Sequence, residues 1–520
     1  MALGVAVLGQ RFESPLELLG DRLKGVYRLL AEHGGRLFPQ DYFADLYKDS
    51  RRGRPTVPAR VLATVMVLQA QEGLSDQEAV DHLECDLRWQ AAAGVDAGCV
   101  GFHSTVLVGQ RNRLRGSARP KRFLEDTRVV AREAGVLRDR VRVLDSTPIY
   151  DAVSTQDTVT QLRSAIRKLL RGLEGSPLAG RVRAVLVRDD EYVSAGKPPC
   201  DWDDPQAREA LVDALVRDAL AALEVVDGVE LVGAAREAAE LLALVAGQDV
   251  EAGADGVFRI AHKVAPDRVI STVDPDARHG HKSRNRRFDG YKAHLSVDPD
   301  SELIDDVVVT PANVHDADAV DDLLAGHADS EDKPTVIGDS AYAGADTLDD
   351  LQQAGFDVNT KVPPAGGIGG RFGKDDFNID LDANTVACPA GHVVTIRSTA
   401  DGGGRADFAE HCADCPLRDR CTTSTSGRSI RIHPKEEILQ RAKTAQADPE
   451  REHAYRSTRP KVERKIAHFV RVAWGARKAR SRGRQRVTTD AVTRAAAVNW
   501  ARLATIGIAF TDGRWTTAPS

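Results

Sequence analysis

A short segment, Val141–Thr147, constrains the fold of this 520-residue chain more than any other stretch. Its branched apolar residues flank one polar residue, and Asp145, two hydroxyl residues and Pro148 follow, which is the pattern of a short buried β-strand. An aspartate at the end of such a strand is held on a rigid element and can offer its carboxylate to a divalent cation. Most strand-terminal aspartates only accept hydrogen bonds in turns, so a function for Asp145 requires partners elsewhere in the chain.

Size and composition restrict the class of protein. A chain of this length can bury more than one core, so we expect about two to four domains. No apolar run approaches the roughly 18 residues of a membrane helix, and Met1–Ser14 lacks a signal pattern, so we expect a cytoplasmic protein. The net charge of −6 argues against indiscriminate coating of nucleic acid, but a local basic patch would still allow DNA binding.

The N-terminal region, residues 1–120, is predicted to be a helical, helix-turn-helix-like DNA-binding domain. Thr56-Val57-Pro58 opens a helix that ends at Gly73, and Ser75-Asp76-Gln77-Glu78 is a capping box that starts the next helix. A tight turn followed by further helix is compatible with DNA contact, although an ordinary helical bundle with a solvated basic end fits nearly as well. The basic end belongs to a helix from about His103 and consists of Arg111, Asn112, Arg113 and Arg115.

The order of the predicted elements after Asp145 favours a mixed α/β core. Residues 151–264 are predicted to be a helical insertion, because strand patterns resume only afterwards. Two strands joined by a hairpin then precede a helix, a strand, a helix and a last strand. The expected strands are Tyr291–Val297, with one buried face, Leu303–Thr310, Thr335–Tyr342 and Phe356–Val362.

This order is the ribonuclease-H-like one, in which the first and fourth strands lie side by side in the sheet. The core would comprise residues 138–150 and 265–365. Asp339, at the end of the fourth strand, would then meet Asp145 at one end of the sheet.

The run His279–Arg287 is strongly basic. It is either a solvated loop or a loop that contacts phosphates, and we favour the second interpretation because Lys and Arg beside glycine can approach a backbone phosphate closely.

Four of the seven cysteines crowd into a second predicted insertion, residues 366–448, which indicates metal binding rather than disulfides. Four thiolates are enough for one tetrahedral, structural zinc ion and leave no coordination position for a water molecule. The alternatives are unligated cysteines in a loop-rich insertion, or replacement of one thiolate by His392 or His411. The expected ligands are Cys388, Cys412, Cys415 and Cys421.

The C-terminal region, residues 449–520, is predicted to consist of basic helices. Between Tyr455 and Arg486 there are twelve Lys or Arg residues and a single acid, Glu463, and we expect helix over most of 450–486, with a kink or a fresh start at Pro460. Glu463 either pairs with Arg459, which is worth only about 0.3–0.5 kcal/mol, or is a third metal carboxylate among cations that hold DNA phosphates. A last apolar helix, 488–506, should pack Trp500 on the core.

Together these motifs resemble the DDE-type insertion-sequence transposases, specifically the group with a Tyr-Arg-Glu-Lys signature and the branch with an inserted zinc motif. Three rather than two residues separate Tyr455 from Arg459, and the signature lysine would fall at Val470, next to Arg471. The matching pieces are Val143-Leu144-Asp145-Ser146-Thr147, Ile337-Gly338-Asp339-Ser340-Ala341-Tyr342-Ala343-Gly344, Tyr455, Arg459, Val462-Glu463, the cysteine cluster and Phe288-Asp289-Gly290-Tyr291-Lys292.

The resemblance implies a transposase that cleaves element ends and joins them to target DNA, with Asp145, Asp339 and Glu463 as its catalytic triad. Three converging carboxylates would repel one another unless cations neutralise them, which also favours two Mg²⁺ or Mn²⁺ ions. The expected partner is double-stranded DNA, both terminal inverted repeats and target, bound by a homodimer. The alternatives are a ribonuclease-H-fold nuclease without strand transfer and an inactive DNA-binding derivative. The residues expected to contact DNA are Lys282, Arg284, Lys292, Tyr455, Arg459, Arg471, Arg477 and Arg480.

Overall fold

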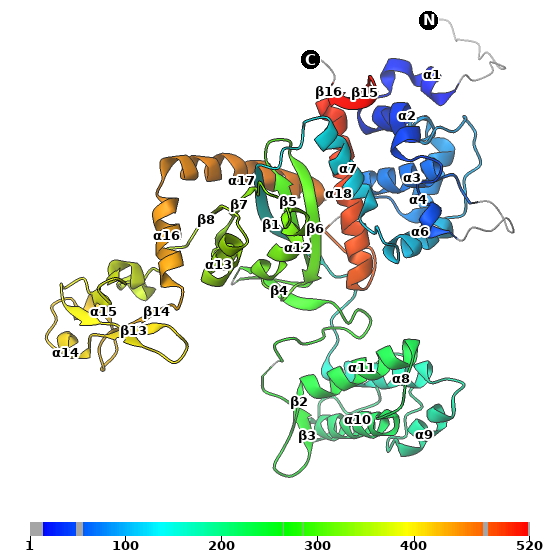
Figure 1. Ribbon diagram of the computed structural model, residues 1–520. Coiled ribbons are helices and arrows are strands. Elements are labelled where there is room, and N and C mark those ends of the chain that lie inside the picture. The colour runs from blue at the N-terminus through cyan, green and yellow to red at the C-terminus, as the bar shows by residue number, and fades with distance from the viewer. Residues whose placement is uncertain (1–13, 48–55, 264, 284, 472–476, 518–520) are drawn as a thin grey trace, which may run out of the picture.

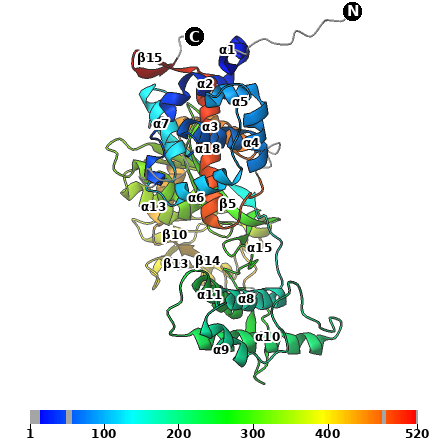
Figure 2. The same ribbon diagram turned by 90° about the vertical axis from the view of Figure 1, so that its right-hand side faces the viewer.

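The structure, a computed structural model, describes the chain except for residues 1–13, 48–55, 264, 284, 472–476 and 518–520. A mixed sheet lies at the centre, with the N-terminal helices on one side of it and the cysteine-containing region at the far end of the opposite side (Figure 1). The helical insertion lies apart from the sheet (Figure 2). Within the described residues, no helix is both long and apolar enough to cross a membrane.

The N-terminal region is helical, as predicted. Gly73 adopts the left-handed conformation, with φ of 73°, and ends α3, and Ser75 and Glu78 form a reciprocal capping box at the start of α4. The C-terminal helix α18, Arg484–Ile506, packs against these helices and against the sheet, and buries Trp500 completely. The other helices are α1 Pro15–Leu19, α2 Gly25–Leu37, α3 Ala59–Glu72, α4 Asp76–Cys85, α5 Leu87–Ala93, α6 Thr105–Arg115 and α7 Arg122–Glu133.

The central sheet confirms the predicted strand adjacency. Its order is β4-β5-β1-β7-β8, and β6 pairs with the same edge of β5 as β4 does, farther along the strand. Strand β1 is antiparallel to β5 and parallel to β7, so the first and fourth predicted strands are neighbours. The strands are β1 Val141–Tyr150, β4 Arg278–Ser283, β5 Arg286–Asp298, β6 Leu303–Pro311, β7 Thr335–Gly338 and β8 Val358–Thr360.

Two short helices, α12 (Val320–Leu324) and α13 (Ala345–Gln353), belong to the sheet core. Helix α12 packs on β5 and β6, whereas α13 leads from β7 into β8. Leu144 of β1 lies in the same buried cluster as apolar side chains of both helices, whereas Val143 packs in the larger core shared with the N-terminal helices. Both faces of the sheet are therefore covered.

Three sequence expectations about the strands need correction. Strand β1 runs on through Pro148 to Tyr150, so Asp145 lies within the strand rather than at its end. Pro148 pairs only with β5, because the pairing with β7 ends at Val143, so its missing N–H costs no ladder bond on that side. Most of β5 is buried on both faces rather than on one. The basic run around residue 282 belongs to a β-hairpin of β4 and β5 rather than to a loop.

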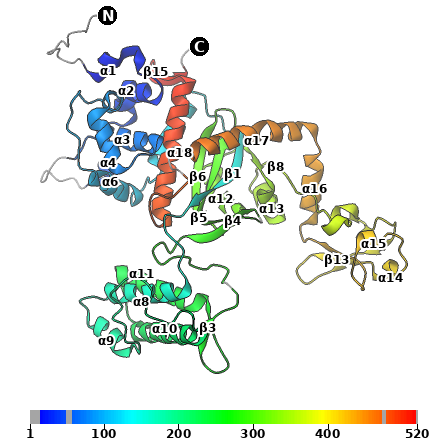
Figure 3. The ribbon, with the colours of Figure 1, turned by 180° about the vertical axis from the view of Figure 1, so that it is seen from behind.

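The predicted helix over 450–486 is also wrong in its extent. Helix α17, Pro449–Phe469, passes through Pro460 without interruption and ends well before Arg486. Residues 472–476 lie outside the described part, and α18 begins at Arg484. Helix α17 crosses beside β1, and α16, Glu436–Gln446, meets it at a sharp angle (Figure 3).

The two insertions each have a core of their own. The helical insertion contains α8 (Thr158–Gly172), α9 (Pro177–Val185), α10 (Pro205–Val226) and α11 (Gly233–Gln248), together with a small hairpin, β2–β3 (Val250–Ala252, Phe258–Ile260). The cysteine-containing region is built of short strands and two single-turn helices around a small apolar cluster. These elements are β9 Asn378–Asp380, β10 Thr385–Ala387, β11 Val393–Thr395, β12 Arg397–Ser398, β13 Gly404–Asp407, α14 Ala409–Cys412, α15 Arg418–Cys421 and β14 Ser429–Ile432; the chain closes with β15 Ile508–Thr511 and β16 Arg514–Thr517.

Candidate active site

Two of the three predicted acids lie at the same end of the sheet. Val143 of β1 is in register with Ile337 of the parallel strand β7, so Asp145 and Asp339 occupy matching positions just beyond the paired segment. Asp339 directly follows β7 and accepts a 2.9 Å hydrogen bond from the Ala341 N–H at the start of the 3₁₀ helix η5, Ser340–Tyr342. The side chain of Asp145 is 15% exposed, which leaves its carboxylate reachable from solvent.

Burial is the dominant influence on the Asp145 carboxyl at this end of the sheet. Burial is the main cause that raises the pKa of Asp145 above its ordinary value, and the Asp339 carboxylate raises it further. The Arg459 guanidinium, 3.1 Å from Asp145, opposes this shift without cancelling it. A cation beside Asp145 would lower the pKa of this carboxyl again.

Helix α17 brings the third acid toward this end. Because the helix continues through Pro460, Tyr455, Arg459 and Glu463 lie along one stripe of it. The Arg459 guanidinium contacts Asp145 and lies 3.9 Å from Glu463, and it also donates a 3.4 Å hydrogen bond to the Leu144 carbonyl. Glu463 itself is 65% exposed. Arg459 thus joins the third acid to β1, and Glu463 is free to change rotamer.

A hydrogen-bonded layer beside Asp145 was missed by sequence reasoning. The Ser146 hydroxyl donates to Asp316 at 2.6 Å, and the Lys292 ammonium donates to the other oxygen of Asp316 at 2.7 Å. This geometry fixes the backbone next to Asp145. Nothing in the sequence around Asp316 connects it to Ser146 or Lys292, which lie 170 and 24 positions away.

Tyr342 is a second residue that the sequence did not single out beyond its place in a motif. Its side chain is 1% exposed, and its hydroxyl has no hydrogen-bond partner among the described residues. Burial, followed by the carboxylates of Asp316, Asp145 and Asp339, holds its pKa well above the ordinary value. A neutral, unpartnered hydroxyl thus lies in the field of the acidic cluster.

The residues predicted to contact DNA have different surroundings. Lys282 is exposed on the β4–β5 hairpin and lies close enough to Asp145 to lower the pKa of that carboxyl. Lys292 is engaged by Asp316, and Tyr455 is half-buried. Arg284 lies outside the described residues.

The other predicted DNA contacts follow α17. Arg471 is exposed and lines a cavity of about 440 Å³ at the end of α17. The Arg477 carbonyl accepts a 2.7 Å hydrogen bond from the Tyr150 N–H at the end of β1. Arg480 is exposed, and its guanidinium donates to the Leu74 carbonyl in the turn between α3 and α4.

The four clustered cysteines face one small cavity. All four, together with His392 and His411, line a space of about 20 Å³, which has room for little more than one water molecule or ion. All four are free thiols. Burial and then the neighbouring thiols of Cys412, Cys388 and Cys415 raise the pKa of Cys421. Thiolates are ligands that zinc prefers. Among the described residues, however, the metal-type ligands whose atoms lie within 4.8 Å of one another belong to Asp139, Asp305 and His327.

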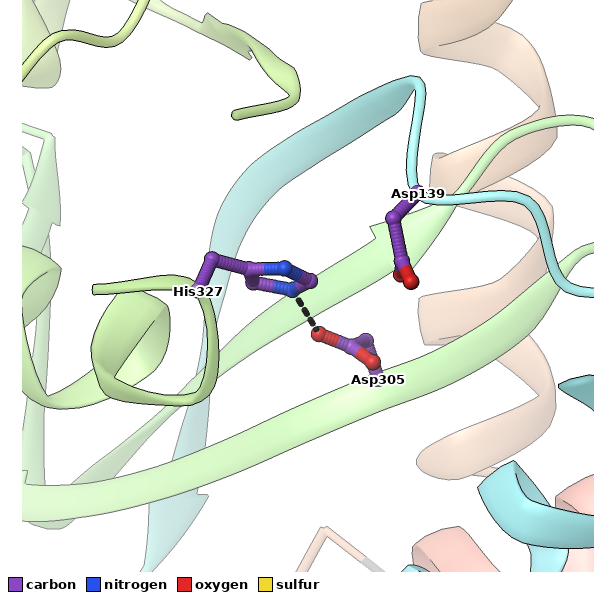
Figure 4. Close-up of side chains that lie close together, drawn as sticks. All are labelled: Asp139, Asp305 and His327. Atoms are coloured by element: carbon purple, nitrogen blue, oxygen red, sulfur yellow. Dashed lines mark hydrogen bonds and ion pairs between the residues drawn. The ribbon is translucent and has the colours of Figure 1, made fainter. Parts of the chain in front are cut away.

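A second group of metal-type ligands lies at the opposite end of β1 (Figure 4). Ligand atoms of Asp139, Asp305 and His327 lie within 4.8 Å of one another, and His327 Nε2 is 2.8 Å from an Asp305 carboxylate oxygen. Arg142 enters this group, with its Nε 3.2 Å from Asp305 and its Nη1 3.4 Å from Asp298. The Arg142, Asp298 and Asp305 side chains are all at most 1% exposed.

The charges of this second group are balanced by arginines. Arg128 and Arg132 lie within 4.0 Å of Asp305 as well, and Arg132 also pairs with Asp139. Three arginines therefore face Asp139, Asp298 and Asp305, and a divalent cation would add uncompensated positive charge to a closed site. We interpret the group as a structural ion-pair network.

The comparisons with known proteins agree with the motifs. Residues 261–500 match the family described as Transposase DDE domain, and residues 26–113 match the family described as Transposase domain (DUF772). The first match includes Asp339 and Glu463, whereas Asp145 precedes it. No curated protein and no solved structure gave a match.

Proposed function

The chain is a DNA transposase of the DDE type, and on this premise we propose that Asp145, Asp339 and Glu463 are its catalytic triad and hold two Mg²⁺ or Mn²⁺ ions. The observation that carries the proposal is the parallel register of β1 and β7, which brings two carboxylates to one end of the sheet. The contact of Arg459 with both Asp145 and Glu463 supports the third assignment.

Each residue of the proposed site would have a separate role in the reaction. When bound, the ions supply Lewis acidity that activates the attacking oxygen and stabilises the leaving 3′ oxygen during in-line displacement at phosphorus. Asp145 and Asp339 offer oxygen ligands from a rigid sheet, and Ser146, Asp316 and Lys292 keep the backbone beside Asp145 from shifting. Glu463, mostly exposed, would complete the ligand set by rotating toward Asp145. The 3′-OH released by cleavage would then attack the target strand.

The finer assignments belong to the same proposal. Double-stranded DNA, as element ends and as target, is the substrate, and a homodimer would hold the two ends. The exposed Lys282 and Arg480, with Arg477 and Arg471, would contact backbone phosphates, whereas Arg459 acts first as a positioning residue for Asp145. We also propose that the chain belongs to the Tyr-Arg-Glu-Lys group and that its domains divide at about residues 120, 150, 265, 366 and 449.

The experiment compares acid variants on DNA carrying the ends of the element, with Mg²⁺ or Mn²⁺. We expect Asp145→Asn, Asp339→Asn and Glu463→Gln to lower cleavage and strand transfer by about a thousandfold or more, because each removes a ligand of charge-stabilising ions. Affinity for the ends should stay within about twofold. Glu450→Gln, an exposed acid in the first turn of the same helix, is the matched control and should retain activity.

Metal-dependent strand transfer by Asp145→Asn would overturn the assignment. Cleavage by the unaltered protein without joining would instead favour a nuclease, and DNA binding without either step would indicate an inactive derivative.

The cysteine cluster is proposed to hold one structural zinc ion through Cys388, Cys412, Cys415 and Cys421. The convergence of four free thiols on one small cavity supports it. Elemental analysis of the purified protein should find about one zinc per chain, falling to none in Cys412→Ser/Cys415→Ser. Loss of zinc only when His392 and His411 are replaced would assign the ligands differently.

A further inference from the structure

A cleft lies between the N-terminal helices and the start of α18. Its volume is about 380 Å³, and its walls come from α3, α4 and α6 on one side and from residues 480–493 on the other. The two walls are far apart in the sequence and belong to the two separate family matches, 26–113 and 261–500, except that Arg115 lies just past the first of them. The cleft therefore forms only when the N-terminal helices and the segment 480–493 pack against each other.

The lining of this cleft carries excess positive charge. Four arginines and two aspartates line it, and both acids are already engaged. Asp76 accepts from Arg111 at 3.0 Å and from Gln69 at 2.7 Å, and Asp490 pairs with Arg494 at 2.5 Å. In the described part of the chain, no ion pair involves the three remaining arginines, Arg115, Arg480 and Arg486.

The Arg115 guanidinium lies close to other positively charged groups in this cleft. One of its Nη atoms donates to Asn112 at 3.1 Å, but its buried Nε finds no acceptor among the described residues. Burial, and then the neighbouring guanidiniums of Arg486 and Arg111, lower its pKa. A bound anion would supply the missing acceptor for the Arg115 Nε and would reduce the repulsion between these guanidiniums.

The cleft is tied mechanically to the strand that carries Asp145. The Tyr150 N–H donates to the Arg477 carbonyl and the Ala479 N–H donates to the Tyr150 carbonyl, both at 2.7 Å. The next residue after Ala479, Arg480, lines the cleft. The backbone that leads into the cleft is thus bonded directly to the end of β1.

We propose that this cleft binds a phosphodiester of the DNA backbone through Arg115, Arg480 and Arg486, and so fixes the DNA against both transposase domains at once. The guanidinium fork matches phosphate oxygens in pairs and keeps its charge at any physiological pH, which suits a sequence-independent backbone contact. The proposal rests on the proposed function, because it takes DNA as the substrate. A free phosphate is the other source of the same chemistry.

The test measures DNA affinity of the full chain carrying Arg115→Gln/Arg486→Gln. Fluorescence anisotropy is read on a duplex of unrelated sequence and on an element end, over a range of salt concentrations. We expect weaker binding to both duplexes by the same factor, and a slope of log K against log salt that is smaller by about 1. Arg115→Lys/Arg486→Lys should retain most of the slope. The matched control is Arg431→Gln/Arg441→Gln, which replaces two exposed arginines in β14 and α16. It should leave the DNA affinity and the salt slope unchanged.

Three outcomes would overturn the proposal. One is an unchanged salt slope in the glutamine variant. Another is a lower melting temperature, since removing two repelling charges from an anion site should leave stability equal or higher. The third is competition by millimolar inorganic phosphate without any effect of the variant on DNA binding, which would assign the cleft to a free anion. Failure of the catalytic triad would be recognised separately, because Asp145→Asn should lose Mg²⁺-dependent strand transfer while keeping its affinity and salt slope for both duplexes.

Discussion

Two polar clusters lie along strand β1, one at its start and one around Asp145 in its middle, and they differ in exposure and in charge balance. At the start of the strand, Arg142 is fully buried against Asp298 and Asp305, and Arg128 and Arg132 complete the neutralisation. Farther along it, Asp145 is paired among the described residues with Arg459, and Glu463 is 65% exposed. Both clusters contain enough acids to suggest a metal site.

The comparison indicates that charge balance, rather than the number of acids, distinguishes the structural ion-pair network from the proposed metal site. Burial alone would raise the pKa of both Asp305 and Asp145. At Asp305 the hydrogen bond from His327 and the charges of Arg142 and Arg128 outweigh burial and hold the pKa well below its ordinary value. At Asp145 burial prevails and the pKa is raised. Asp298 of the first cluster also has a pKa raised by burial, so the contrast in charge balance is between Asp305 and Asp145.

The largest expected effect comes from breaking the balanced cluster. Arg142→Met removes the central guanidinium and leaves Asp298 and Asp305 buried without their partner, so the free energy of unfolding should fall by about 3–5 kcal/mol. Urea unfolding followed by circular dichroism measures it. The control Arg236→Met breaks an exposed pair with Glu240 and should cost no more than about 0.5 kcal/mol. A loss at Arg142 as small as that of the control would show that the network contributes little to stability.

Divalent metal should distinguish the two clusters directly. With Mn²⁺ at about 100 times its dissociation constant, mass action should stabilise the protein by about 2.7 kcal/mol, read as a higher melting temperature. Asp145→Asn should abolish this gain, whereas His327→Gln should keep it even if its starting stability is lower. The opposite pattern, a gain lost in His327→Gln and kept in Asp145→Asn, would move the metal site to the Asp139, Asp305 and His327 cluster.

Local signals made part of this structure predictable from the sequence. Gly73 and the Ser75–Glu78 box act within one helical turn, and the apolar runs at β1 and β7 are strands wherever they are buried. Once the order of elements was known, the pairing of β1 with β7 followed. The meeting of Asp145 and Asp339 could therefore be anticipated.

The remainder depends on contacts between distant segments. The end of α17 at Phe469 lies within a basic stretch whose composition does not change there. The basic residues of β4 form a strand only because the long strand β5 offers them an edge. Asp316 and Arg142 bind partners on other strands, and Arg115 and Arg486 meet only because both line the cleft between the N-terminal helices and α18. A one-dimensional pattern contains none of these distances.

The smallest expected effect on stability concerns Tyr342, at the unbalanced end. Its buried hydroxyl has no partner in the described structure, so Tyr342→Phe should change the free energy of unfolding by less than about 0.5 kcal/mol. Tyr291→Phe is the matched control, because the Tyr291 hydroxyl is buried and donates to Asp274 at 2.6 Å, and its loss should cost about 1–3 kcal/mol. If the Tyr342 hydroxyl serves the oxygen ligands of the loaded site, strand transfer should slow by about tenfold in Tyr342→Phe while stability is preserved. An unchanged rate would make the hydroxyl irrelevant to the reaction, and a loss of stability like that of Tyr291→Phe would place Tyr342 with the structural cluster instead.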